Sequence, residues 1–215
     1  MISIVAVMLL VPTLGFAVIA GSGHDFSDGV PVAEAWAIGG SGAVEICVPC
    51  HTPHNTLATV PPLWNRNASG AAYVGYGNPN GTMQNGAVAA PGATSGSLGC
   101  LSCHDGVGLV DAFGAAAGSG TLTGLGYPAA AELGTNLTTT HPIAFTYDAA
   151  DWTLVAVGSA TALGGTIATD LLKGAANDQV ECSSCHDVHN RYGNPPLLLI
   201  DNTASALCTT CHGAM

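Results

Sequence analysis

The sequence predicts a mostly irregular chain with short helices and a few short strands, organised around groups other than its own side chains. Three observations lead to this fold class. The 215 residues include 29 glycines and 12 prolines, and only 6% are aromatic. Large apolar side chains are scarce after residue 20, and no segment keeps a long helical period. Such a chain buries a thin core of its own, so we expect something else to fill the interior.

The charge is low and one-sided. Three basic residues stand against fourteen acidic ones, giving a formal net charge of -11. Nucleic acids and anionic membrane surfaces are bound by basic patches. We therefore expect neither nucleic acid nor an anionic membrane surface among the partners.

The first twenty residues, MISIVAVMLLVPTLGFAVIA, are apolar without a charged side chain. Small residues at Val18 and Ala20, before Gly21, suit a secretory cleavage site. The run is also just long enough for an uncleaved anchor. We expect residues 1–20 to be a signal peptide or anchor and 21–215 to be one domain. The protein is then exported, to the exterior or cell surface, or else periplasmic or membrane-anchored, with membrane contact only if residues 1–20 are retained.

Three later segments carry local signals. Residues 65–99 are rich in Gly, Asn and Pro and predict a long surface loop, which is uncommon in a compact domain unless it is functional or held by something else. Residues 143–157, IAFTYDAADWTLVAV, predict one or two strands. DLLKGA, from Asp170, predicts a short helical turn.

One motif, Cys-x-x-Cys-His, occurs four times and uses all eight cysteines. It is the attachment signature of c-type haem, in which both thiols form thioethers and the histidine binds the iron. We therefore predict four covalently bound haem c groups, at residues 47–51, 100–104, 182–186 and 208–212. The predicted thioether residues are Cys47, Cys50, Cys100, Cys103, Cys182, Cys185, Cys208 and Cys211. The predicted proximal ligands are His51, His104, His186 and His212.

Other uses of these cysteines explain less of the motif pattern. Zinc sites can be built from Cys-x-x-Cys half-sites, and a secreted chain can use an even number of cysteines for disulfides. Neither explains why a histidine follows every second cysteine. A thioredoxin-like redox pair needs one such motif in a βαβ context, not four in Gly-rich loops.

The histidine count matches the demand of four six-coordinate irons. Eight histidines are present, and four lie outside the motifs. We predict that these four are distal ligands: His24, His54, His141 and His189. The competing interpretation gives one haem Met83, Met215 or an open position instead.

The positions of the extra histidines limit which iron each one can bind. His54 and His189 each lie three residues beyond a proximal histidine, so neither can reach the opposite face of that neighbour's haem. Each must bind a different haem, which would hold two porphyrins close together. His141 lies between the second and third motifs, so sequence order makes it a candidate for the third haem. His24 could fold back onto the first or second haem, or reach into a neighbouring subunit.

These sites predict outer-sphere electron transfer rather than enzymatic catalysis. Two histidines fill both axial positions of an iron, and bis-histidine ligation predicts low potentials. The first hypothesis is an electron-conducting filament subunit, and the second is a monomeric periplasmic shuttle between a quinol oxidase and a terminal reductase. A small haem reductase with one open iron is the third.

The segments ICVPCHTPHN, PLWNR, CLSCHDG, HPIAF, VECSSCHDVHN and ALCTTCH resemble the doubled-CxxCH multihaem c-type cytochromes. In length, haem number and motif order the chain is most similar to filament-forming extracellular tetrahaem cytochromes of the OmcE type. This resemblance implies head-to-tail polymerisation of identical subunits, with a continuous stacked chain of haems. It further implies electron exchange with redox partner proteins or extracellular acceptors.

Overall fold

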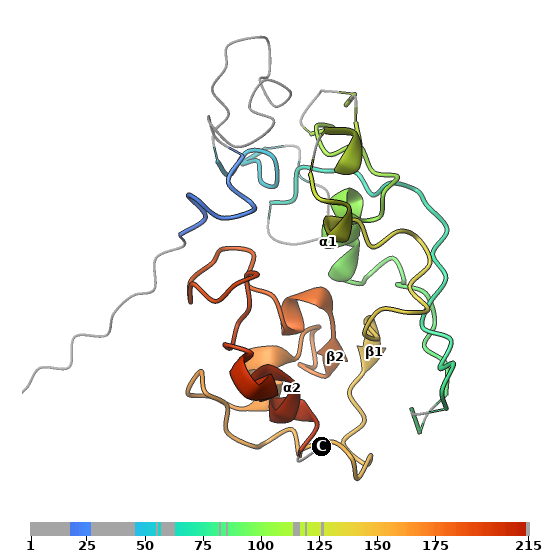
Figure 1. The fold of residues 1–215 in the computed structure, drawn as a ribbon, viewed down its shortest axis with the longest axis vertical. Coiled ribbons are helices and arrows are strands. Elements are labelled where there is room, and N and C mark those ends of the chain that lie inside the picture. Colours follow the sequence, from blue (N-terminus) through green and yellow to red (C-terminus); the bar gives the residue numbers. More distant parts are fainter. Residues whose placement is uncertain are drawn as a thin grey trace, which may run out of the picture.

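A computed structural model describes residues 18–26, 46–54, 56, 63–81, 83–84, 86–113, 117–118, 120–125 and 127–213. These residues are mostly coil with short helices and one small sheet, as predicted (Figure 1). The α-helices are α1 (Ser97–His104) and α2 (Ala206–Cys211). The shorter helical turns are η2 (Thr123–Leu125), η3 (Ala129–Ala131), η4 (Ile167–Leu171), η5 (Cys182–Ser184) and η6 (Thr203–Ser205). The strands are β1 (Phe145–Thr146) and β2 (Gln179–Val180).

The two strands pair antiparallel, with Phe145 opposite Val180 and Thr146 opposite Gln179. Of the predicted strand segment 143–157, only these two residues are extended in a sheet. The reason lies at Asp151, whose Oδ1 accepts hydrogen bonds from the backbone N–H and hydroxyl of Thr153, at 2.8 and 2.6 Å. Such local side-chain bonds favour a turn over a continuing strand.

In its described residues the predicted loop 65–99 contains no helix or strand before α1, and its last three residues belong to that helix. A second segment of the chain holds it in place. The Val74 N–H donates to the Thr135 carbonyl at 2.9 Å, and the Leu137 N–H donates to the Val74 carbonyl at 2.8 Å. Figure 1 shows this run beside the segment that leads to β1.

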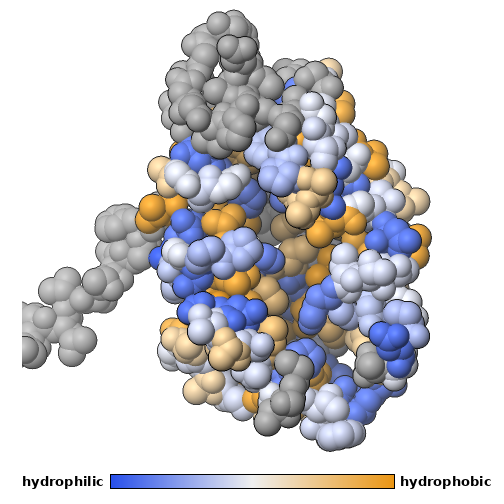
Figure 2. Space-filling view, viewed as in Figure 1, coloured by the Kyte–Doolittle hydropathy of each residue, from blue (hydrophilic) through white to orange (hydrophobic). Residues whose placement is uncertain are grey.

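The apolar core of the described residues consists of three small clusters beside the cysteine motifs. Val110, Phe113 and Leu122 pack with Cys103. A second cluster of Leu171, Leu199, Ile200 and Leu207 packs with Cys185 and Cys211, and a third of Tyr147, Ile167 and Leu172 also reaches Cys211. Figure 2 shows further hydrophobic residues in the middle of one face, between hydrophilic ones. The thin apolar core expected from composition is therefore divided into separate clusters, each packed beside a cysteine motif.

Two other predictions concern single segments. The helical turn predicted from Asp170 is η4, one π-type turn that begins earlier, where the Thr166 hydroxyl accepts the Thr169 N–H at 3.3 Å. Of the predicted signal or anchor segment, residues 1–17 lie outside the described residues. Among the residues that are described, no helix is both long and apolar enough to cross a membrane.

Candidate haem-binding sites

Each Cys-x-x-Cys-His motif forms one helical turn. The histidine N–H donates to the carbonyl of the first cysteine at 2.8 Å in the first motif and at 3.0 Å in the third and fourth. The second motif lies within α1. On a helical turn, residues i, i+3 and i+4 lie on one face. Both thiols and the imidazole therefore project from the same side, as attachment of one porphyrin requires.

Several histidines are oriented by backbone carbonyls. Nδ1 of His104 lies 2.6 Å from the Ala131 carbonyl oxygen, and Nδ1 of His186 lies 3.2 Å from that of Pro196. Nδ1 of His141 is 2.9 Å from the Pro142 carbonyl oxygen. A carbonyl can only accept, so each Nδ1 carries the proton. Nε2 is then free to bind a metal, which is the usual arrangement of a metal-binding histidine.

Three of the four motif histidines face one histidine from outside the motifs. The ring centroids of each pair lie 6.0 to 6.1 Å apart. Two metal–nitrogen bonds of about 2 Å, with about 1 Å from each nitrogen to its ring centre, give about 6 Å. Each pair therefore fits two axial ligands of one iron. The pairs are His104 with His24, His51 with His189, and His212 with His141.

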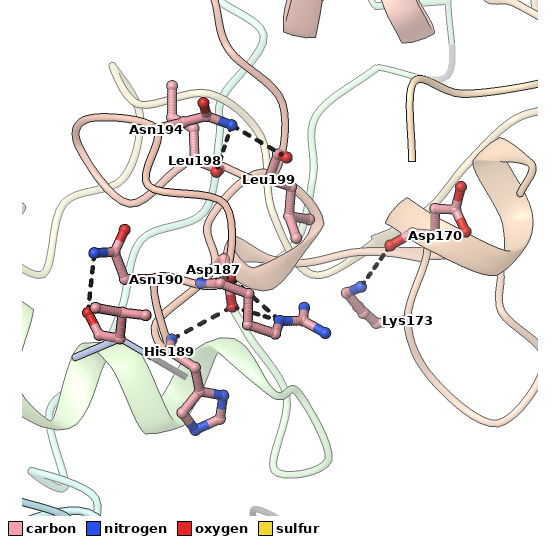
Figure 3. A network of polar contacts seen from close by, with 10 residues as sticks. Asp170, Lys173, Asp187, His189, Asn190, Asn194, Leu198 and Leu199 are labelled. Atoms are coloured by element: carbon pink, nitrogen blue, oxygen red, sulfur yellow. Dashed lines mark hydrogen bonds and ion pairs between the residues drawn. The ribbon is translucent and has the colours of Figure 1, made fainter. Parts of the chain in front are cut away.

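The N-terminal arm that carries His24 is bound to the turn that carries His189, just after the third motif. The Val18 N–H donates to the His189 carbonyl at 2.9 Å, and Asn190 Nδ2 donates to the Val18 carbonyl at 3.0 Å. Buried Asp187 fixes the turn by accepting the N–H groups of His189 and Arg191 (Figure 3). Burial and the neighbouring His104 lower the pKa of His24 to about 4, so its ring is neutral, as a ligand must be.

His141 lies beside His212 of the fourth motif, whereas sequence order suggested the third haem. Two contacts explain the difference. The Tyr147 hydroxyl donates to the Cys211 carbonyl at 3.2 Å, and the Val155 N–H donates to the same carbonyl at 2.8 Å. The segment that follows His141 is therefore bound to the C-terminal motif.

The two remaining histidines are His54 and His186. Both are exposed, and neither ring contacts another histidine ring within the described residues. Of the alternative ligands, Met83 is held by backbone contacts in a turn with Asn78, at 3.1 Å in both directions. Met215 lies outside the described residues.

The attachment sites of the second and third motifs adjoin. The thiols of Cys100 and Cys182 lie close enough to interact, and this interaction together with burial raises the pKa of Cys100. Burial raises the pKa of Cys50 to about 12 and that of Cys185 to about 11. These thiols are therefore neutral near pH 7 in the free chain.

A disulfide or a zinc site would each require a particular grouping of the cysteines. All eight cysteines are described, and none forms a disulfide. Within the described residues, no three His, Cys, Asp or Glu side chains form a group that could hold a metal ion by themselves.

Sequence reasoning missed two charged residues beside the motifs, Arg66 and Glu181. Their side chains are 2% and 6% exposed. Charged side chains are almost never buried unless they are paired. The scarcity of basic residues is a signal that could have pointed to Arg66, which is one of only three. Glu181 is one of fourteen acidic residues, and the sequence does not single it out.

Residues 174–215 match the family model described as the doubled CXXCH motif. No curated protein matches the chain. The matched region holds the third and fourth motifs. It indicates a multihaem c-type cytochrome with doubled CXXCH motifs and covalently bound haem c.

Proposed function

We propose that this chain is a tetrahaem c-type cytochrome that transfers electrons through closely packed bis-histidine haems. The observation that carries the proposal is the set of three histidine pairs at 6.0 to 6.1 Å, each joining a motif histidine to a second histidine from elsewhere. Haem c supplies reversible one-electron chemistry when bound. The chain contributes the attachment turns, the axial ligands and the carbonyls that orient them. Filling both axial positions leaves no place for a substrate, which makes the protein an electron carrier.

We further propose that the carrier is the repeating subunit of an extracellular conductive filament. His54 and His186 are the two histidines that face no other histidine ring among the described residues, and both are exposed. His54 of one copy can therefore serve His186 of the next, completing the fourth bis-histidine site between subunits. A chain with only 8% charged residues also suits extensive cover of its surface by neighbouring copies. Within one chain, His24 already faces His104, so His24 acts inside the subunit.

Purified wild-type protein and two histidine variants test this assignment by negative-stain microscopy and sizing. His54→Ala is expected to abolish filaments while keeping four attached haems. His24→Ala is the matched control, because it also removes one distal imidazole but leaves filaments intact. Unchanged filaments in His54→Ala would refute ligation between subunits. A monodisperse wild-type monomer would favour the alternative, a periplasmic shuttle between a quinol oxidase and a terminal reductase.

Carbon monoxide separates the carrier from the enzyme. The reduced filament is expected to bind no carbon monoxide, because every iron has two histidines. Stoichiometric binding to the reduced wild-type filament would instead support a reductase with an open iron.

A further inference from the structure

Glu181 is a buried carboxylate between the second and third haem-attachment motifs. Its Oε2 accepts hydrogen bonds from the Ser95 hydroxyl at 2.7 Å, from the Ser97 N–H at 3.1 Å and from the Ser97 hydroxyl. The residue is 6% exposed. Three donors therefore converge on one carboxylate oxygen, and hydrogen bonds to a charged acceptor are stronger than neutral ones.

The same residue joins two attachment sites that are distant in sequence. Ser97 begins α1, which carries the second motif, and Glu181 directly precedes Cys182 of the third. The Cys182 N–H donates to the Ser97 hydroxyl at 3.0 Å, and the Glu181 N–H donates to the Ser184 hydroxyl at 2.9 Å. These contacts hold both attachment sites side by side, and the thiols of Cys100 and Cys182 lie close enough to interact.

No cation contacts Glu181 within the described residues. Arg66 donates to backbone carbonyls, and Lys173 donates to the Asp170 carbonyl at 3.1 Å. Arg191 pairs with Asp187. The negative charge of Glu181 is therefore stabilised by neutral donors alone, and its field acts on the surrounding low-dielectric interior.

We propose that Glu181 is a positioning residue that also lowers the reduction potentials of the haems attached at the second and third motifs. A nearby negative charge favours the oxidised form of an iron centre, which carries one more positive charge than the reduced form. The effect is confined to the two sites beside the carboxylate, so electrons pass more readily from these two sites to the other two. This inference rests on the proposed electron-transfer function.

The test compares wild-type protein with Glu181→Gln, a variant of the same shape without the charge. Intact mass gives the number of attached haems, and a redox titration followed by electron paramagnetic resonance resolves the one-electron steps. The expected result is four haems, with two of the four midpoint potentials moved in the positive direction. No movement, or equal movement of all four, would overturn the proposal.

Ser97→Ala provides a second, opposite measurement. It keeps the charge but removes one of the donors that offset it, so the same two potentials are expected to move in the negative direction. Movement in the same direction as in Glu181→Gln would reveal a merely structural effect and overturn the proposal. If Glu181→Gln does not mature with four haems, an unshifted Ser97→Ala would also overturn it.

Different results would refute the proposed function and the role of Glu181. A wild-type protein without four reversible one-electron steps would refute the proposed function. Four reversible steps whose midpoint potentials are unchanged in both variants would refute only the role of Glu181.

Discussion

Arg66 is the most deeply buried basic side chain among the described residues, and replacing it tests how the first two motifs are held together. Its guanidinium donates to the Val110 carbonyl at 2.7 Å, the Leu109 carbonyl at 2.8 Å and the Pro49 carbonyl at 3.4 Å. Pro49 lies within the first motif, and Leu109 and Val110 follow the second. The cation therefore links the first motif to the segment that follows the second motif.

The structure sets the magnitude expected for Arg66→Met. Two short hydrogen bonds from a charged donor contribute about 1.5–3 kcal/mol each. The Leu109 residue is partly exposed, so water can replace its lost bond, whereas Val110 is fully buried. Methionine also avoids the desolvation of the cation. We expect a net loss of about 3 kcal/mol in the free energy of unfolding.

Guanidinium unfolding of the four-haem protein, followed by circular dichroism, measures this loss. Arg66→Lys keeps the charge but cannot reach both short partners, so it should fall between wild type and Arg66→Met. Arg191→Met is the matched control, since Arg191 is 45% exposed and its ion pair with Asp187 contributes under about 1 kcal/mol. A loss in Arg66→Met no larger than in Arg191→Met would refute the reasoning.

Two further substitutions probe the remaining parts of the site. His24→Ala removes the ring opposite His104, so the reduced variant is expected to bind one equivalent of carbon monoxide with all four haems still attached; absence of binding in the carbon monoxide difference spectrum would show that His24 is no ligand. Tyr147→Phe removes the hydrogen bonds to the Val155 and Cys211 carbonyls, at 2.6 and 3.2 Å. A loss of about 1–2 kcal/mol is expected in the same unfolding assay, and an unchanged midpoint would show that this hydroxyl does not stabilise the C-terminal motif.

The sequence predicts the fold class well because composition and the absence of periodicity report directly on it. The long loop before α1 followed from its Gly, Asn and Pro content. The strand at 143–157 was overestimated, because the side chain of Asp151 forms a turn that propensity does not reveal. The helical turn of each motif has no separate signal in the sequence, although its i, i+3 and i+4 positions share one face as haem attachment requires.

Sequence order could not predict which histidine lies opposite which motif histidine. His141 faces the fourth motif because Tyr147 and Val155 contact Cys211, which is a tertiary contact without a local signal. His24 faces the second motif because the arm before it is bound to residues 189 and 190. The rule that His189 must serve an iron other than that of His186 needed only their spacing, and the structure places His189 beside His51.

An experimental density map of the purified protein tests the central claim most directly. We expect four haems, with irons between His51 and His189, between His104 and His24, and between His212 and His141. We expect the fourth iron at His186, with His54 of a neighbouring copy on its other face. Fewer than four haems, or an axial pair that differs from these, would contradict this claim.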